Sequence, residues 1–237
     1  MFYFNNQDST DFLIENKVRH SLLPQLEKRT LTVAGRPGFY DFGSRLGGRE
    51  IQVDVTIKES SSLMLRQKAR DIASWLYHQE VKPLLFSDEP DKHYFARVDG
   101  KTDIDEIVGL GQGTITFLCP DPFAYGAIKT VPLHAGPITN EGSYDTYPVI
   151  TLQFQQATSQ LRIRSGDKQV LLVHPFQQGQ ELVVDHNRAV VKLNDLRIMN
   201  SLYLSSEFFP IYKGDNWITL EPANIATATV QFREKWL

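Results

Sequence analysis

Closely spaced glycines are the first feature of the sequence that could bind a ligand. The run GLGQG, Gly109 to Gly113, has the composition of loops whose backbone amides approach phosphate groups. Dinucleotide-binding loops and P-loops both require a helix directly after the glycines, with its N-terminus facing the phosphate. Here the next residues, Thr114 to Leu118, follow the alternating pattern of a strand. The run therefore predicts a hairpin turn and not a nucleotide site.

An acidic segment, DGKTDIDE, invites comparison with a calcium-binding loop. Counted from Asp99, the sixth position is Ile104, where the loop needs glycine, and the twelfth is Leu110, where it needs a bidentate glutamate. Asp103 and Asp105 could instead be the two carboxylates of a glycosidase, but such a pair must flank a cleft. Two acids two residues apart on a hairpin rarely do so. We expect a solvated acidic hairpin here.

The histidines and the single cysteine complete the set of reactive side chains. No two histidines have the HxxxH or HExxH spacing that places two imidazoles on one metal ion. We expect all six to be surface or turn residues: His20, His78, His93, His134, His174 and His186. Cys119 has no partner for an intrachain disulfide, and its position before Pro120 favours a small buried side chain. Because a GxSxG motif is missing too, the sequence predicts no catalytic residue, no metal site, no cofactor and no enzymatic activity.

Trp217 is the last residue with the chemistry of a binding site, since an exposed indole can stack on a sugar ring. In the segment GDNWITLEP it shares its strand parity with Thr219, while Ile218 and Leu220 face the other way. One of these two faces is buried, and the alternation does not say which. Trp217 is therefore kept as a candidate sugar-stacking residue.

The composition of the chain excludes several classes of function. The chain has 237 residues, of which 41% are hydrophobic and 22% charged, and it has no apolar run near the ~18 residues that a membrane helix needs. We therefore expect no membrane insertion. The start, MFYFNNQDSTDF, lacks the basic and apolar regions of a secretory signal. A net charge of −3 argues against a nucleic-acid-binding protein, which gains most of its affinity from Lys and Arg at phosphates.

The first half of the chain is predicted to hold strands and one helix. Residues 51–57 alternate strictly, with Ile51, Val53, Val55 and Ile57 assigned to the core. A helix follows, with N-cap hydroxyls at Ser60, Ser61 and Ser62 and one apolar face made of Leu65, Ala69, Ile72 and Leu76. Further strands are predicted at 94–98 and 114–118. The preceding segment GRPGFYDFGSRLGG, residues 35–48, is interpreted as a glycine-rich contact loop.

The second half of the chain is predicted to differ from the first, with many short strands and no helix. Two prolines and a glycine within 119–126 interrupt regular structure, which indicates a domain boundary that divides the chain into residues 1–128 and 129–237. After it, short strands recur every ~8 to 12 residues, as in an antiparallel sandwich. They are predicted at 149–154, 161–164, 169–173, 181–184, 189–193, 202–204, 217–220 and 227–232. Gly166 in the turn SGDK suits a type II′ hairpin. The predicted fold class is mainly β, with two β domains.

Several ordered stretches of this sequence resemble the distal tail proteins of long-tailed, non-contractile bacteriophages, the Dit family of siphophages or prophages. In the N-terminal part the resemblance rests on Pro24, Arg29, Val33, Gly35, Arg36, Gly38, Tyr40, Phe42, Gly43 and Arg49. It continues at Pro83, Phe86, Asp88, Tyr94, Ala96, Arg97, Gly113, Phe117, Cys119, Pro120, Asp121, Pro122, Ala124 and Tyr125. The segments NEGSYDTYPVITLQF, FFPIYKGDNWITL and REKWL extend it, more loosely, through the second half.

The resemblance implies a structural protein of the virion, placed at the tip of the phage tail after assembly in the cytoplasm of the host bacterium. Its first domain would be a β-sandwich-like ring or belt domain with one helix, forming a homo-hexameric ring. The partners implied are the tail tube protein on one side and the tip or baseplate and receptor-binding proteins on the other. We expect genomic DNA to pass through the ring without specific binding, because six chains of charge −3 sum to −18 and a lumen without basic stripes would not hold the genome.

The second domain would be a galectin-like sandwich, which raises the alternative of a carbohydrate-binding protein that recognises host cell-wall or capsule sugars. Galectins bind galactosides through His, Asn and Arg at alternate strand positions. Here His186, Asn187 and Arg188 are contiguous and cannot share one face of a strand, so a turn with Asn187 in a left-handed conformation is expected. A ring needs one face of each subunit to meet a different face of the next. Phe39, Tyr40 and Phe42 are the predicted interface residues.

Overall fold

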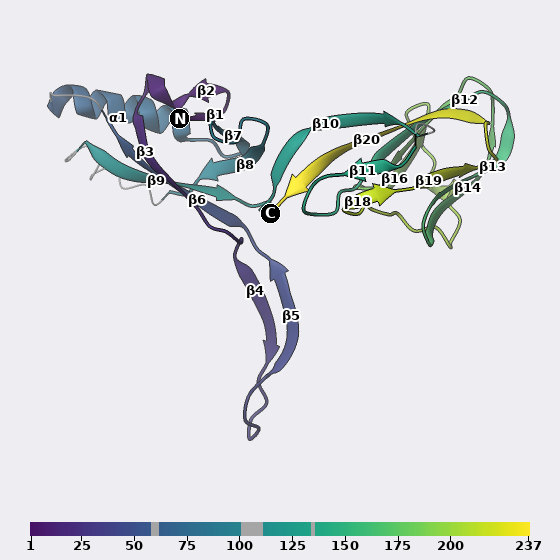
Figure 1. The fold of residues 1–237 in the computed structure, drawn as a ribbon, viewed down its shortest axis with the longest axis horizontal. Helices are drawn as coiled ribbons and strands as arrows, with labels where there is room; N and C mark the ends of the chain where they lie inside the picture. The colour runs from purple at the N-terminus through teal and green to yellow at the C-terminus, as the bar shows by residue number, and fades with distance from the viewer. Residues whose placement is uncertain (58–61, 101–110, 134–135) are drawn as a thin grey trace. The chain divides into compact units, whose positions relative to one another are not determined.

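The computed structural model describes residues 1–57, 62–100, 111–133 and 136–237 (Figure 1). Several residues for which predictions were made lie outside these ranges: Ser60, Ser61, Asp103, Ile104, Asp105, Gly109, Leu110 and His134. The chain divides into two compact units, Met1–Tyr125 with Leu237, and Gly126–Trp236. Each unit is described by itself below.

The first unit is built from antiparallel strands in the order β3-β6-β9-β8-β7-β1-β2. The strands are β1 (Phe2–Phe4), β2 (Gln7–Asp8), β3 (Ile14–His20), β6 (Arg49–Thr56), β7 (Lys82–Phe86), β8 (His93–Val98) and β9 (Gln112–Cys119). A 3-10 turn, η1 (Ser9–Asp11), follows β2, and β10 (Ala124–Pro132) begins in this unit. Two further strands, β4 (Leu26–Leu31) and β5 (Tyr40–Leu46), pair only with each other and form a separate hairpin.

The predicted strand at residues 51–57 is confirmed as the centre of the first core. Ile51, Val53, Val55 and Ile57 are all buried, because β6 lies between β3 and β9 with one face turned inward. Inward-facing residues of the neighbouring strands complete this core: Phe2, Phe4, Leu84, Phe86, Ala96, Ile115, Phe117 and Cys119.

The predicted helix is present as α1 (Ser62–Leu76), the one α-helix among the described residues. Ala69, Ile72 and Leu76 are buried as expected, whereas Leu65 is only half-buried. Trp75 is also buried, and its indole Nε1 donates to the carbonyl of Phe4 at 3.1 Å. Its ring stacks on that of Phe12, with centroids 4.6 Å apart. These contacts attach the helix to the N-terminal strands.

The second unit contains two sheets that share one core. One follows the order β17-β16-β15-β12-β20 and the other is β14-β13-β19. Phe154 of β12 and Phe176 of β14 stack with centroids 4.6 Å apart, so the two sheets pack face to face as a sandwich. A small sheet, β11 with β18, lies beside them. The prediction of a mainly β fold is confirmed.

The strands of the second unit agree with most of the predicted ranges. They are β11 (Ile138–Asn140), β12 (Val149–Phe154), β13 (Thr158–Ser165), β14 (Lys168–Phe176), β15 (Glu181–Asp185), β16 (Val190–Leu193), β17 (Leu196–Arg197), β18 (Gly214–Asn216), β19 (Ile218–Glu221) and β20 (Ala226–Trp236), with a 3-10 turn η2 (Met199–Ser201). The hairpin at Gly166 is confirmed, since Ser165 pairs with Lys168 and Gly166 has φ +57°.

Two predictions for the second unit are wrong. Residues 202–204 do not form a strand: Leu202 makes a single bridge to Leu172, and the chain then turns. The turn after β15 does include residues 186–189, but its left-handed residue is Ala189, with φ +52°, and not Asn187. The Oδ1 atom of Asp185 accepts hydrogen bonds from the backbone amides of Asn187 and Arg188. These bonds fix the first half of the turn, so the left-handed residue comes later.

Candidate interaction surface

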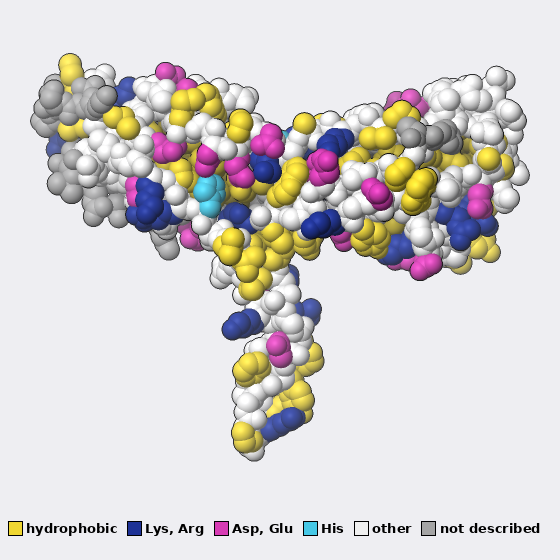
Figure 2. Space-filling view, viewed as in Figure 1, with side chains coloured by type: hydrophobic (Ala, Val, Ile, Leu, Met, Phe, Trp, Pro, Cys, Tyr) yellow, Lys and Arg dark blue, Asp and Glu magenta, His cyan; other side chains and the backbone are white. Residues whose placement is uncertain are grey.

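The most exposed part of the first unit is the β4–β5 hairpin. Among the described residues, β4 and β5 pair only with each other, and all side chains between Leu26 and Arg45 are exposed. In Figure 1 the hairpin stands away from the sheet that precedes and follows it, and Figure 2 shows hydrophobic and basic side chains along its length. An isolated two-stranded ribbon is marginally stable in water. The hairpin is therefore a surface that a partner can complete.

This hairpin corrects the prediction of a loop at residues 35–48. Only the turn near Gly35 and Gly38, both with φ above +80°, is irregular, while residues 40–46 are strand β5. Gly43, with φ +83°, occurs where the register shifts between the pairs Lys28–Ser44 and Thr30–Asp41. Asp41 Oδ1 accepts from the Gly43 amide at 2.9 Å and closes this bulge. The glycines therefore shape a twisted ribbon instead of providing a mobile loop.

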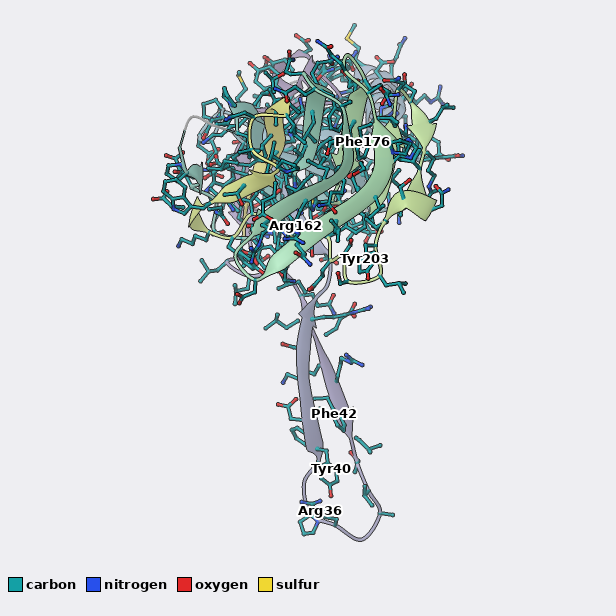
Figure 3. The ribbon with its side chains drawn as sticks, turned by 90° about the vertical axis from the view of Figure 1, so that its right-hand side faces the viewer. Arg36, Tyr40, Phe42, Arg162, Phe176 and Tyr203 are labelled. Atoms are coloured by element: carbon teal, nitrogen blue, oxygen red, sulfur yellow. The ribbon has the colours of Figure 1, made fainter. Side chains whose placement is uncertain are left out.

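The three predicted interface residues lie on this hairpin and do not fold back onto their own sheet. Phe39, Tyr40 and Phe42 remain 64%, 44% and 62% exposed. Figure 3 shows Tyr40 and Arg36 towards the outer end of the hairpin, with Phe42 nearer its base. The guanidinium carbon of Arg36 lies 4.2 Å from the centroid of the Tyr40 ring. The exposed aromatic rings are consistent with a contact surface, and their role as an interface stays a prediction.

The base of the hairpin is closed by its own two strands and lies close to β9 of the first sheet. The Gly47 amide donates to the carbonyl of Gln25 at 2.7 Å, which closes the ribbon. A Cβ at Gly48 would lie 3.1 Å from the carbonyl oxygen of Cys119, a contact tighter than side chains normally make. Glycine at position 48 therefore allows the hairpin strand to pass close to β9 as it enters β6.

Trp217, the candidate sugar-stacking residue, is 65% exposed, whereas Ile218 and Leu220 are buried. This settles which face of β19 is turned inward. Tyr212, also exposed, lies near in sequence, and its amide is held by the buried side chain of Asn216 at 2.8 Å. The indole is therefore available to a ligand, and its sugar-stacking role stays a prediction.

His186 lies in the turn after β15, in keeping with the expectation of surface or turn residues, but its side chain is buried. It is 2% exposed, its ring packs against Phe208 and Phe209, and its Nδ1 accepts from the Phe209 amide at 3.0 Å. Burial lowers the pKa of His186 to about 4. Because the imidazole points into the sandwich, it cannot act with Asn187 and Arg188 on a galactoside.

A buried polar cluster at one end of the first core was not foreseen. Arg49 is 4% exposed, and its Nε and Nη2 have no hydrogen-bond partner among the described residues. Its guanidinium carbon lies 5.8 Å from the Tyr94 ring centroid, and its strand position pairs with Cys119. Burial raises the pKa of the Cys119 thiol to about 12, which confirms the small buried side chain predicted there. The inward parity of Arg49 with Ile51 was the signal available in the sequence.

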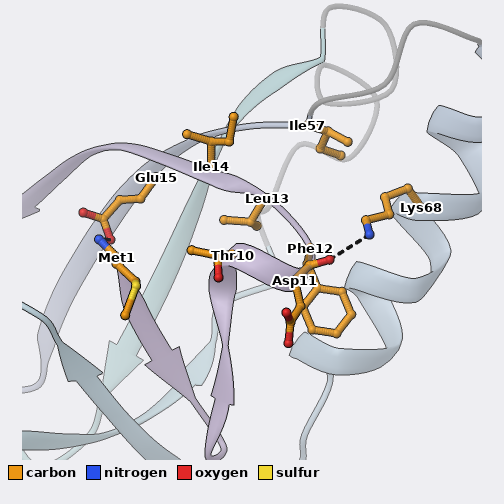
Figure 4. A pocket seen from close by; sticks show the side chains of 9 residues that line it. All are labelled: Met1, Thr10, Asp11, Phe12, Leu13, Ile14, Glu15, Ile57 and Lys68. Atoms are coloured by element: carbon orange, nitrogen blue, oxygen red, sulfur yellow. Dashed lines mark hydrogen bonds and ion pairs between the residues drawn. The ribbon is translucent and has the colours of Figure 1, made fainter.

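A cavity of about 410 Å³ beside the N-terminus is lined by apolar and polar residues, and its two cationic groups are both paired (Figure 4). Lys68 Nζ donates to the carbonyl of Asp11 at 2.8 Å, and the Met1 ammonium pairs with Glu15 at 2.8 Å. These contacts tie η1 and β3 to neighbouring elements. In the described parts of the chain, no three His, Cys, Asp or Glu side chains are grouped to hold a metal ion. No described helix is long and apolar enough to cross a membrane.

Both units of the chain match models of known protein families. Residues 6–119 match the family model described as the phage tail protein RIFT-related domain, and residues 141–236 match the siphovirus-type tail component, C-terminal domain. The chain is 28% identical to the distal tail protein of Bacillus phage SPP1 over 248 residues, which cover 99% of this chain and 94% of the relative.

The fold is also similar to a solved structure over its entire length. The crystal structure of SPP1 Dit, titled a paradigm of the hub adsorption apparatus in phages that infect Gram-positive bacteria, superposes with a TM-score of 0.82 and 24% identity. The alignment covers 100% of this chain and 98% of that one. Two family models in the expected order, a relative matched end to end and a shared two-unit β fold lead to one conclusion: this chain belongs to the siphophage distal tail protein family.

Proposed function

We propose that this protein is a structural hub at the distal end of a phage tail. Six copies form a ring through residues 1–128, which joins the tail tube protein to the tip or baseplate and receptor-binding proteins. Residues 129–237 form the second domain of each subunit, a galectin-like sandwich. DNA passes through the ring without specific binding. The observation that carries the proposal is the exposed aromatic hairpin β4–β5, in a chain whose whole length matches a distal tail protein.

The physical argument for self-association starts from the hairpin. Phe39 and Phe42 leave large apolar rings in water, and aromatic side chains dominate the binding energy of protein interfaces. A hairpin without packing on either face gains most from a partner that covers it. Closed rings use heterologous contacts, in which a projecting element of one subunit meets a different surface of the next.

Sedimentation of the purified chain tests the ring. We expect a species near six times 27.1 kDa at high protein concentration, and six-fold rings in negative-stain images. The mass of the particle should fall on dilution, since association follows mass action. A chain that stays monomeric at every accessible concentration would count against self-assembly through its own surfaces.

A second function, binding of cell-wall or capsule sugars by the sandwich, is favoured by one observation, the exposure of Trp217. Stacking of a sugar ring on an exposed indole would change its fluorescence. Titration with bacterial cell-wall glycans should then shift the emission of the native chain and not that of a Trp217→Ala variant. An identical response from both chains would remove this residue from consideration.

A further inference from the structure

The outward face of the sheet β14-β13-β19 carries three charged side chains. On β13, Leu161 and Ile163 are buried, so Arg162 and Arg164 point away from the core. The same alternation on β19 turns Glu221 outward. Figure 3 shows the place of Arg162 on this sheet. The three charges therefore lie on one face of the second unit.

One carboxylate holds both guanidinium groups. Glu221 Oε2 accepts from Arg162 Nη1 at 2.8 Å, and Glu221 Oε1 lies 3.6 Å from Arg164 Nη1. Arg162, Arg164 and Glu221 remain 38%, 48% and 46% exposed. Each guanidinium has five N–H donors and each carboxylate about four acceptor sites, so neither kind of group is used up by these contacts. The trio therefore presents free donors beside free acceptors in a fixed arrangement.

Trp217 lies at the end of the same face. Its side chain is 65% exposed, whereas the next residue, Ile218, is buried. Arg164 pairs with Thr219, two residues after Trp217, so Trp217 and Arg164 are diagonal neighbours. Such neighbours lie about 7 to 8 Å apart, within reach of aromatic and long side chains. The indole therefore offers an apolar plane beside the Arg–Glu–Arg trio.

The charges around the indole balance. Lys168, in the turn that adjoins Trp217, donates to Glu207 at 2.7 Å, and Asp215 accepts from the hydroxyl of Thr139 at 2.6 Å. The charged residues within four positions of Trp217 or three of Ser165, the strand partner of Ile218, together with Glu207, are four basic and four acidic: Arg162, Arg164, Lys168, Lys213, Asp167, Glu207, Asp215 and Glu221. A ligand without charge suits a surface that has no excess charge of its own.

A neutral sugar has the chemistry that this face can bind. One side of a pyranose ring presents mainly C–H groups, which can stack on the indole of Trp217. Its vicinal hydroxyls each donate and accept, so one can donate to Glu221 while its neighbour accepts from Arg164. A protein partner fits less well, because the centres of protein interfaces are depleted in charged residues, and charged residues form the centre of this face.

We propose that the outward face of β13 and β19 binds a neutral pyranose, with Trp217 stacked on the ring and with Arg164 and Glu221 hydrogen-bonded to its vicinal hydroxyls. Arg162 is a positioning residue, since it holds the Glu221 carboxylate. This inference rests on the second function proposed above, sugar binding by the sandwich, and names the site and the class of its ligand.

Calorimetric titration of the full chain tests the class of ligand. The probes are two neutral tetrasaccharides, cellotetraose and chitotetraose, and one acidic tetrasaccharide, that of hyaluronan. We expect at least one neutral probe to bind and the acidic one not to bind. The dissociation constant for the neutral probe should not change between about 0.05 and about 0.5 M NaCl, because salt screens only interactions between charges.

Three variants test the site itself. Trp217→Ala and Arg164→Gln should each raise the dissociation constant about tenfold or more, since each removes a contact to the sugar. Arg188→Gln is the matched control: Arg188 also lies near a carboxylate, 3.9 Å from Asp185, but in the turn after β15 and not on this face. Its affinity should equal that of the native chain. Equal unfolding midpoints for all chains would show that the substitutions leave the fold intact.

The outcomes separate this inference from the proposal on which it rests. Neutral-sugar binding that is weakened in Trp217→Ala and Arg164→Gln and kept in Arg188→Gln would support both. Binding that all three variants retain would leave sugar binding standing and overturn this site, and a loss in Trp217→Ala alone would overturn the role of Arg164. Preferred binding of the hyaluronan probe, weakening with salt, would overturn the neutral class of ligand. No binding of any probe would count against both proposals.

Discussion

The guanidinium of Arg36 lies over the ring of Tyr40, 4.2 Å from its centroid, on a hairpin whose side chains are otherwise in solvent. At an exposed site a cation–π contact contributes about 0.5 to 1 kcal/mol. This contact fixes both side chains at the turn end of the ribbon before any partner arrives. A surface already ordered in this way loses less side-chain entropy on binding than a flexible loop.

Removing the aromatic rings of the hairpin should weaken association more than it weakens folding. We expect Tyr40→Ser with Phe42→Ser to cost about 2 kcal/mol or more per subunit contact, as interface aromatic residues commonly do. Sedimentation over a dilution series measures the loss, and calorimetry follows the unfolding midpoint. Tyr203→Ser, an exposed tyrosine of the second unit, serves as the control. A lowered midpoint with unchanged association would assign the rings to the core.

Replacing Gly43 by alanine should disturb the hairpin locally. Its φ of +83° belongs to the left-handed region that side chains disfavour, so we expect a cost of about 1 kcal/mol. Hydrogen exchange of the β4–β5 amides should accelerate, while that of β6 should not. Gly100→Ala is a suitable comparison, because Gly100 has ordinary φ and open space around it. Equal protection of the hairpin in both variants would contradict the role given to the bulge.

The buried guanidinium of Arg49 should cost stability instead of providing it. Burial of a guanidinium whose Nε and Nη2 lack hydrogen-bond partners is unfavourable, and its replacement by an apolar residue of similar size is often neutral or stabilising by about 1 to 4 kcal/mol. We expect Arg49→Met to unfold at the same or a higher urea concentration than the wild type. Arg49→Ala should be less stable than Arg49→Met, since it leaves a cavity. A large loss in Arg49→Met would show that the cation–π contact with Tyr94 outweighs desolvation.

Acidification should destabilise the second unit through His186. Its folded pKa is lowered from 6.5 to about 4, so the unfolded chain binds the extra proton first as the pH falls. The stability contributed by the neutral imidazole is full above pH 6.5 and decreases as the pH falls from 6.5 towards 4, by an amount on the order of 3 kcal/mol. Urea unfolding at several pH values measures this slope.

His186→Asn is the control for this pH dependence. Its side-chain oxygen can accept from the Phe209 amide as Nδ1 does, but it does not titrate in this range. The variant should lose part of the slope between pH 6.5 and 4. His20 continues to contribute, because its ring, although the residue is exposed, packs against Phe86 and the partial loss of solvation lowers its pKa. Identical slopes in both chains would mean that His186 is not the responsible group.

The thiol of Cys119 should not react with disulfide reagents in the native protein. Burial raises its pKa to about 12, so almost no thiolate forms at neutral pH. A disulfide reagent should therefore modify no thiol in buffer and one thiol per chain in urea. Rapid labelling of the native chain would show that the first core opens at this end.

Local pattern sufficed for the parts of the fold in which side chains alternate regularly. The strand from Ile51 to Ile57 and the apolar face of α1 were predictable, because a strand or helix with one buried face repeats its apolar residues with a fixed spacing. Gly166 specified its hairpin for the same local reason, since only certain residues adopt the required φ. The family resemblance added the expected order of two domains, and the two family models match residues 6–119 and 141–236.

Tertiary structure decided the features that depend on distant neighbours. Strand β5 could not be predicted from the sequence, because both faces of the hairpin are exposed and no alternation of apolar residues indicates a strand. Its glycines are also typical of a loop. His186 and Arg49 are polar residues in buried places, which only the strands packed around them determine. The parity of Trp217 was visible in the sequence, but which face of its strand met the second sheet depended on how the two layers of the sandwich pack.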